Sequence, residues 1–241
     1  MAADERRLRW VPLIAALIAA ALGTALGTWQ VSRGHEKRDL QERYEKLSRD
    51  APVTVSDAPV RASDVELRRV FAHGTFEPRY AVYLDNRVMH GVPGYYVIMP
   101  LKVSAQRYVL VNRGWIAGLP DRSRLPQVRT PAGPVDVTGI ATVPAKRPFE
   151  LSSQVIEGRV WQNLTVERYR QAYAVPIQPF VIRQENALDD GLKREWEPPD
   201  FGIERHYGYA VQWYLLAITA LAFYGITHVR RRRKNGQEEQ A

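Results

Sequence analysis

The sequence contains no cysteine among its 241 residues. Disulfide bonds, thiolate metal sites and a cysteine nucleophile are therefore excluded. The sequence also lacks a Gly-x-Ser-x-Gly elbow, a His-Glu-x-x-His zinc motif, a phosphate-binding glycine-rich loop and a dinucleotide fingerprint. Its five histidines are scattered. No two of them have the three- or four-residue spacing that a metal-binding helix face requires. The conventional sequence signatures of an enzyme are therefore missing.

Soft metal ligands are few. Met89 and His90, with Met99 downstream, could bind copper, because thioether and imidazole groups suit that metal. The alternative is that these residues serve packing and the surface. Copper delivery therefore stays open as one of the less favoured functions.

Excess acidic charge is also absent, since the formal net charge is +8. Residues 1–29 carry +1 and residues 230–241 carry +3, which leaves +4 for residues 30–206. Much of the basic excess thus flanks apolar segments, where it reports membrane orientation rather than a nucleic-acid surface. We expect no nucleic-acid partner.

Two long segments lack charge altogether. Residues 207–229 contain no Asp, Glu, Lys or Arg over 23 residues, and residues 11–29 contain none over 19. A helix rises ~1.5 Å per residue, so each segment is long enough to cross most or all of the ~30 Å hydrocarbon core of a bilayer. Arginines precede the first segment, and Arg230 to Lys234 follow the second. The positive-inside rule then places residues 1–10 and 230–241 in the cytoplasm and residues 30–206 outside.

The first apolar segment has a second interpretation. A short basic stretch followed by an apolar run and small residues also resembles a cleavable signal peptide. Its length beyond a typical signal core favours a permanent span. Gly23 and Gly27 form a small-x-x-x-small face on which another helix can approach closely.

The segment between the spans has a different pattern. Residues 33–48 are compatible with a helix that continues the first span. Seven short β-branched or aromatic runs then predict strands, at residues 69–76, 81–84, 95–101, 108–116, 135–141, 159–162 and 179–183. Residues 165–173 predict a helix with Thr165 as its N-cap, and residues 119–134 and 184–199 read as surface loops. The fold class is thus an α+β membrane protein in which two transmembrane helices flank one mainly antiparallel, β-rich extracytoplasmic domain.

Two loop motifs repeat an Asn-Arg pair at the end of a strand. Asn86-Arg87 is one, and Asn112-Arg113-Gly114-Trp115 is the other. Asn and Gly suit turns, which leaves the arginines and the tryptophan available to a partner. The alternative is that the arginines pair with local acids or carbonyls while Trp115 packs against a barrel wall.

Several motifs together resemble a known family. They are Leu26-Gly-Thr-Trp-Gln30 with Arg33, Gly74-Thr-Phe76, Asn86-Arg87, Gly94-Tyr95, Pro100-Leu101, Val109-Leu-Val-Asn-Arg-Gly-Trp-Ile116 and His206 through Trp213. In order and spacing they resemble the surfeit locus protein one family of cytochrome c oxidase assembly factors. The resemblance extends from Leu26 to Trp213.

The resemblance implies an assembly factor of the cell inner membrane, not an enzyme, that assists insertion of haem a into the catalytic subunit of a haem-copper oxidase. The implied partners are that subunit, haem a synthase and the lipid bilayer. In bacterial members the histidine at the mouth of the second span is implicated in binding haem a, transiently, and it matches His206. Further candidate contact residues for a partner are Trp29, Gln30, Arg33, Asn86, Arg87, Asn112, Arg113, Gly114 and Trp115.

The residues near His206 are compatible with an axial ligand of haem iron. One ring nitrogen could face the membrane side while the other meets water or a backbone carbonyl, which would set the tautomer. Tyr209, Ala210 and Trp213 follow three, four and seven residues later on the same helical face, and the small Ala210 would leave room for a macrocycle. The alternatives are an interfacial histidine that bonds headgroups or its Glu204 and Arg205 neighbours, a structural scaffold without haem, and an envelope enzyme with a spatially assembled site.

Overall fold

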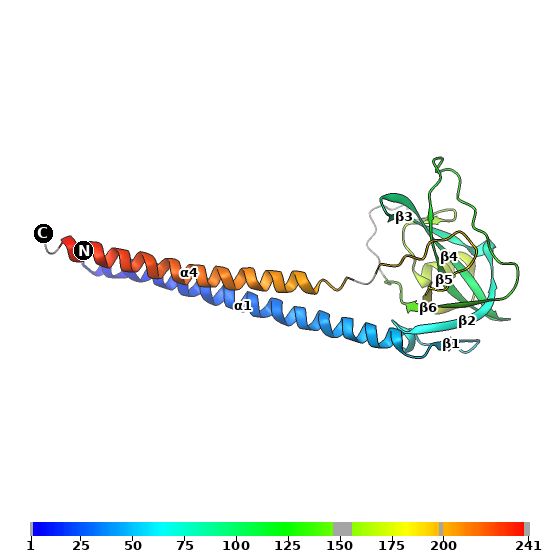
Figure 1. Ribbon diagram of the computed structural model, residues 1–241, viewed down its shortest axis with the longest axis horizontal. Coiled ribbons are helices and arrows are strands. Elements are labelled where there is room, and N and C mark those ends of the chain that lie inside the picture. The colour runs from blue at the N-terminus through cyan, green and yellow to red at the C-terminus, as the bar shows by residue number, and fades with distance from the viewer. Residues whose placement is uncertain (1, 147–155, 198–199, 239–241) are drawn as a thin grey trace. The chain divides into compact units, whose positions relative to one another are not determined.

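The computed structural model describes residues 2–146, 156–197 and 200–238. The chain divides into two compact units, one formed by Met1–Arg43 with Pro199–Ala241 and the other by Tyr44–Pro198. The first unit is a pair of helices and the second is rich in strands (Figure 1).

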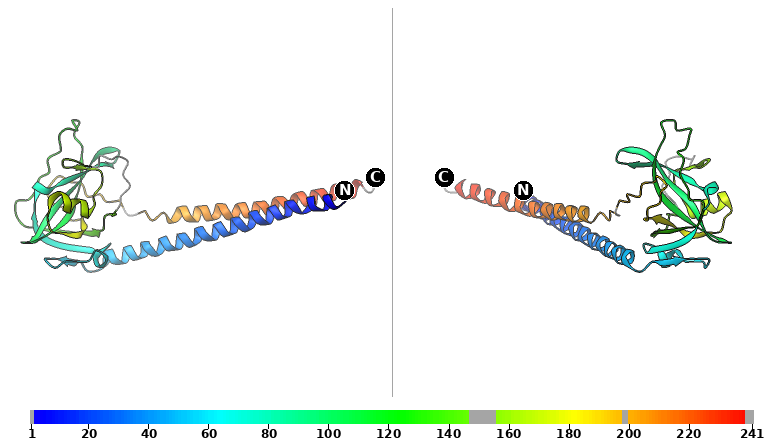
Figure 2. Two further views of the ribbon diagram at one scale, coloured as in Figure 1. Left: turned by 180° about the vertical axis from the view of Figure 1, so that it is seen from behind. Right: turned by 45° about the vertical axis from the view of Figure 1, so that its right-hand side comes forward.

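The helix pair consists of α1 (Ala2–Arg49) and α4 (Ile203–Glu238). Both helices are long and apolar enough to cross a membrane. They lie side by side, and the first turns of α1 lie near the last turns of α4, so they run antiparallel (Figure 2). Each helix continues beyond its charge-free segment, and the predicted helical extension over residues 33–48 is confirmed within α1.

Glycines let the two helices approach closely. A Cβ atom on Gly23 would lie 2.9 Å from the Ala217 Cβ atom, and one on Gly27 would lie 2.6 Å from the Tyr214 ring. Further along, a Cβ on Gly34 would lie 3.0 Å from the ring of Tyr207. The small face predicted at Gly23 and Gly27 is therefore the face that packs against α4.

All seven predicted strand segments contain strand residues in the second unit, although only Val160–Trp161 is strand within residues 159–162. The helix predicted at residues 165–173 is present at Val166–Tyr173. The elements are β1 (Val53–Val55), α2 (Ala62–Val65), β2 (Arg69–Phe76), the 3₁₀ helix η1 (Pro78–Tyr80), β3 (Val82–Met89), β4 (Val92–Ser104), β5 (Arg107–Ala117), β6 (Val135–Thr142), β7 (Ile156–Glu157), β8 (Val160–Trp161), α3 (Val166–Tyr173) and β9 (Ile177–Gln184). The Thr165 side chain accepts a hydrogen bond from the Arg168 backbone N–H, which confirms it as the N-cap of α3.

The strands form one sheet that closes on itself. Its order is β1-β2-β6-β9-β5-β4-β3-β8-β7, and an additional pairing of β2 with β4 completes a ring of β2, β6, β9, β5 and β4. Gly74 permits this closure, because a Cβ there would lie 2.2 Å from the Lys102 carbonyl oxygen. Pairings among the described residues are mainly antiparallel, as predicted, but β1–β2, β3–β8 and β5–β9 are parallel.

Strands β4 and β5 are buried on both faces. Val97, Met99 and Leu101 of β4 belong to one core cluster together with residues of β2, β5 and β9. Ile98, between them, belongs to a second cluster that includes Trp161 of β8 and Tyr169 of α3. The helix α3 therefore covers the other side of these strands, which explains their nearly continuous apolar sequence.

Neither of the two predicted surface loops lies at the surface throughout. Residues 119–134 form no helix or strand, as expected, but Pro126 is buried and Leu125 and Val128 pack against the core. In the segment 185–197, Asp190 and Leu192 are buried. The backbone of Lys193 also exchanges two hydrogen bonds with that of Trp115 in β5. The acidic composition of this segment suggested full exposure, but one of its acids is a buried ion-pair partner.

Candidate functional site

His206 lies in the first turn of α4 and is half-buried. Its Nδ1 atom is 2.7 Å from the Oε1 atom of Gln30 in α1. The second contact of the imidazole ring, expected to be water or a backbone carbonyl, is therefore a side-chain amide oxygen from the other helix. Gln30 was predicted as a contact for a partner protein, but the structure places its amide on His206.

Aromatic and basic side chains contact one another on the neighbouring turns of both helices. The ring of Tyr207 lies 6.2 Å from that of His35 in an edge arrangement, and the Arg38 guanidinium lies 5.4 Å from the centre of the Tyr207 ring. Arg33 pairs with Glu36 at 2.6 Å and lies 5.9 Å from the exposed Trp29 ring. Trp29 and Arg33 thus remain exposed on α1, as a partner contact requires.

The three residues predicted to line a wall below His206 do not share one environment. Tyr209 is 53% exposed, whereas Ala210 is only 3% exposed. Ala210 shares a face of α4 with Tyr207 and Tyr214, which pack against Gly34 and Gly27 of α1, so its small side chain faces the neighbouring helix. This burial gives no support to the expectation that Ala210 leaves room for a macrocycle, because the spacing of residues along one helix does not reveal which face a second helix covers.

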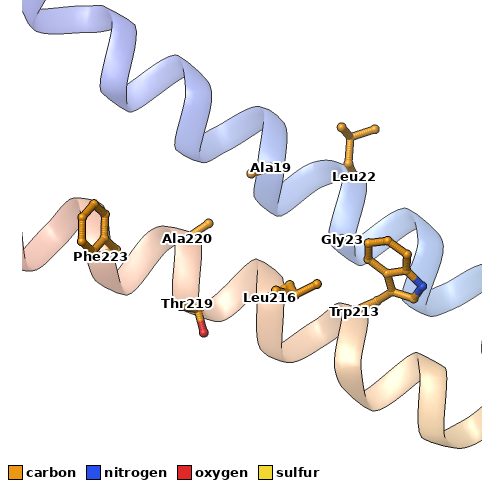
Figure 3. Close-up of a pocket in the computed structure, with 8 residues that line it drawn as sticks. All are labelled: Ala19, Leu22, Gly23, Trp213, Leu216, Thr219, Ala220 and Phe223. Carbon is orange, nitrogen blue, oxygen red and sulfur yellow. The ribbon is translucent and has the colours of Figure 1, made fainter.

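Trp213 lines an apolar groove along the helix pair (Figure 3). The groove has a volume of about 520 Å³ and is lined by Ala19, Leu22, Gly23, Trp213, Leu216, Thr219, Ala220 and Phe223. Trp213 in the groove is seven residues after His206 in α4, and Gly23 in the groove is seven residues before Gln30 in α1. The groove and the His206–Gln30 contact are therefore formed by the same two helices, at different positions along them.

The Asn112-Arg113-Gly114-Trp115 motif serves the interior of the barrel unit. The Arg113 side chain is fully buried and donates hydrogen bonds to Asp190 (2.8 Å), Thr130 Oγ1 (2.8 Å) and the Arg129 carbonyl oxygen (3.0 Å). Burial lowers the pKa of Arg113, and Asp190 opposes this effect. Arg113 cannot reach a partner, so the alternative of a local ion pair is the correct one.

Trp115 and Gly114 are also enclosed. Trp115 is 4% exposed, and its indole N–H donates to the Arg87 carbonyl oxygen at 2.7 Å. Gly114 has a φ of 136°, and a Cβ there would lie 2.6 Å from the Lys193 carbonyl oxygen, so only glycine fits. These two residues position the 185–197 segment instead of contacting a partner.

The first Asn-Arg pair is more accessible. Asn86 is exposed with a φ of 56°, a conformation that asparagine tolerates. Arg87 is half-buried and donates to the Gln162 carbonyl oxygen at 3.2 Å. Asn112 is half-buried and accepts from the Gly114 N–H at 3.3 Å. Only Asn86 of these retains an open side chain.

Two residues with structural roles were not predicted from the sequence. Asp190 anchors Arg113, and Trp196 donates its indole N–H to the Gln184 carbonyl oxygen at 2.7 Å while its ring lies 5.4 Å from that of Tyr96. Asp189 and Asp190 are neighbours in the sequence, and the sequence does not indicate which of the two carboxylates is buried. Trp196 lay in a segment assigned to the surface by composition.

The structure separates the residues considered for copper. The Met99 sulfur lies in the core beside Arg113, while His90 is exposed and its Nε2 atom lies 2.8 Å from Glu195. Met99 is seven residues beyond Val92 in β4, roughly 20 Å along the strand from the turn that carries His90. Among the described residues, no group of three or more His, Cys, Asp or Glu side chains is placed to hold a metal ion.

Known proteins are similar to this chain over as much as 87% of its length. The chain is 33% identical to a SURF1-like protein of Dictyostelium discoideum over 43% of this chain and 42% of that protein. It is 27% identical to a SURF1-like protein of Rickettsia felis over 87% of this chain and 93% of that protein. It is 29% identical to the cytochrome oxidase assembly protein SHY1 of Saccharomyces cerevisiae over 64% of this chain and 42% of that protein. The SURF1 family profile matches residues 17–218, and the chain therefore belongs to the SURF1 family.

Proposed function

We propose that this protein is a membrane-anchored factor for the assembly of cytochrome c oxidase, and that it assists the insertion of haem a into the catalytic subunit. Membership of the SURF1 family supports the first part, since a relative is named a cytochrome oxidase assembly protein. Two helices apolar enough to span a bilayer support membrane anchoring. The basic residues that flank them support cytoplasmic termini and a periplasmic barrel unit.

The observation that best supports haem binding is the environment of His206. Its ring is half-buried at the start of α4, and one nitrogen is engaged by Gln30. A histidine ligand of a metal commonly donates its other N–H to a neighbouring acceptor, which orients the ring. The donor set therefore fits an axial imidazole ligand for haem iron. Haem a is the cargo in this proposal, and His206 would hold it by giving an imidazole nitrogen to the iron.

Two further side chains are candidates to contact a haem bound next to His206. Tyr209, one turn further along α4, is exposed and available to contact its apolar edge. Arg38 lies against Tyr207 and, among the residues that the structure describes, forms no ion pair with a carboxylate. It is a candidate to neutralise a haem propionate, because a guanidinium binds carboxylates in a planar, paired geometry. Trp213 and the apolar groove lie further along the helix pair.

The partners in this proposal are the catalytic subunit of the oxidase, haem a synthase and the bilayer. Exposed residues that remain candidates for protein contact are Trp29, Arg33 and Asn86. An assembly factor needs no catalytic group of its own, which agrees with the names of the relatives. A scaffold without haem is the alternative, and it predicts that His206 is replaceable.

The test is the absorption spectrum of the full-length protein purified from cells that make haem a. We expect a haem band that is lost in His206→Ala and retained in His228→Ala, which alters the far end of the same helix. His73→Ala and His90→Ala examine whether the barrel unit supplies the ligand. If the His206→Ala protein keeps its haem and supports normal oxidase activity, the scaffold alternative replaces haem binding.

A further inference from the structure

Gln30 and His206 are 176 residues apart in the sequence, yet they form a direct hydrogen bond between α1 and α4. An amide oxygen accepts hydrogen bonds and cannot donate them, so the imidazole nitrogen that faces it carries the proton. In a neutral ring the other nitrogen then has the free lone pair. The geometry assigns the proton to Nδ1 and the lone pair to Nε2.

We propose that Gln30 is a positioning residue that holds His206 in this tautomer and presents Nε2 as the ligand atom. The inference rests on the proposed function, because it names the residue that prepares the same site. Gln30 acts through His206, and no direct contact between Gln30 and haem is required. It replaces the role of Gln30 as a contact for a partner protein.

The helix pair holds Gln30 in place from both sides. Gly27 and Gly34, three residues before and four residues after Gln30, both lie on the face of α1 that packs against α4. Side chains at these spacings share a helical face. The close contacts at Tyr214 and Tyr207 therefore bring the backbone of α1 near α4 on either side of Gln30. The Thr28 and Tyr214 hydroxyls, 3.2 Å apart, add a second polar contact.

A neutral partner suits a ligand that must later release its cargo. A carboxylate at this position would pull the Nδ1 proton more strongly and make the imidazole a more basic ligand. The amide of Gln30 orients the ring without that added negative charge. We therefore expect Gln30→Glu to retain haem longer than the wild type, and Gln30→Met, which is similar in length but has no hydrogen-bond acceptor of comparable strength, to retain it less.

The first experiment needs no haem. The ¹⁵N chemical shifts of the imidazole ring in the full-length protein, labelled at histidine and held in lipid nanodiscs, identify which nitrogen is protonated. Measured at about pH 8, where an ordinary imidazole is neutral, His206 should be protonated at Nδ1 in the wild type. In Gln30→Met the two tautomers should mix, and Gln30→Glu should restore the Nδ1-protonated form. Thr227→Val, which removes a hydroxyl that bonds the Phe223 and Tyr224 carbonyl oxygens of its own helix far from His206, should leave the tautomer unchanged.

The second experiment measures haem retention in the same variants. Loss of an outer-shell partner typically lowers metal affinity about 10–100-fold, and we expect a fall in this range for Gln30→Met. Gln30→Glu should slow the transfer of haem to apomyoglobin relative to the wild type. The Soret band of Gln30→Met should shift or broaden, because the His206 ring would adopt more than one orientation.

The outcomes separate the inference from the function on which it rests. If wild-type His206 is protonated at Nε2, or if Gln30→Met keeps the wild-type tautomer, the positioning role of Gln30 is wrong whatever the haem content. If His206→Ala loses haem while Gln30→Met keeps wild-type affinity and spectrum, haem binding stands and the role of Gln30 fails. If the wild type shows the Nδ1 tautomer but binds no haem, the proposed function fails, and with it the role of Gln30 toward a ligand.

Discussion

The guanidinium of Arg113 and the carboxylate of Asp190 form an ion pair at 2.8 Å, with both side chains fully withdrawn from solvent. They lie 77 residues apart in the sequence. Asp190 also pairs with Arg194 and accepts the Leu192 N–H at 3.1 Å. The pair thus fastens the 185–197 segment to β5, so the segment that leads toward α4 is anchored in the core.

Asp190→Ala should strongly destabilise the barrel unit, because it leaves the Arg113 charge buried without its carboxylate. Removal of one partner of a buried ion pair commonly costs about 3–5 kcal/mol. The free energy of unfolding of the full-length protein in micelles, from denaturant titration, measures this effect. The neighbouring Asp189→Ala is the control, since its pair with Arg129 is exposed and should contribute less than about 1 kcal/mol. Equal effects of the two variants would contradict the structural role of Asp190.

Alkaline pH should destabilise the barrel unit through its buried tyrosines. Burial raises the pKa of Tyr83, Tyr169 and Tyr173 above the ordinary value of 10.0. Above pH 10 the unfolded chain therefore loses tyrosine protons that the folded chain keeps, and stability falls as pH rises. The stabilising contribution is complete below pH 10 and is lost through the higher folded pKa values.

Tyr169→Phe tests this pH dependence. Its hydroxyl donates to the Tyr80 carbonyl oxygen, so the variant should be about 1 kcal/mol less stable at neutral pH. Its loss of stability between about pH 8 and pH 11 should nevertheless be smaller than that of the wild type. Denaturant midpoints at the two pH values provide the measurement. An identical pH slope in both proteins would show that Tyr169 does not contribute.

Gly27→Val should separate α1 from α4 near His206. A Cβ at Gly27 would lie 2.6 Å from the Tyr214 ring, whereas one at Gly225 would meet nothing within 4 Å. Because the natural chain has no cysteine, a Gln30→Cys and His206→Cys pair can be joined by a short bifunctional reagent without side reactions. The yield of the intramolecular cross-link should fall in Gly27→Val and persist in Gly225→Val. An unchanged yield in Gly27→Val would contradict this packing.

The orientation proposed for the two helices can be tested with a reporter that is active only in the cytoplasm. Fused after Lys234, the reporter should be active, because basic residues follow the second apolar segment. Inserted among the exposed residues 121–124 of the connector, it should be inactive. The reverse pattern would place the barrel unit in the cytoplasm and would exclude a haem site at the outer leaflet.

Much of the fold follows from local sequence patterns. Charge-free runs marked both long helices, and short apolar runs between turn residues marked β2, β4, β5, β6 and β9. Thr165 was recognisable as a cap because its bond to Arg168 spans only three residues. Periodicity and capping act between neighbours in the chain, so they can be read without knowledge of the fold.

Local patterns in the sequence located the helices and most strands, and they placed His206 at the mouth of the second apolar segment. The contact of Gln30 with His206, the burial of Ala210, the pairing of Arg113 with Asp190 and the closure of the barrel by β2 on β4 became apparent only in the folded chain. Each of these contacts joins residues far apart in the chain or depends on which face another element covers. Such contacts arise from packing and burial, whose energies depend on the assembled core and leave no periodic trace in the sequence.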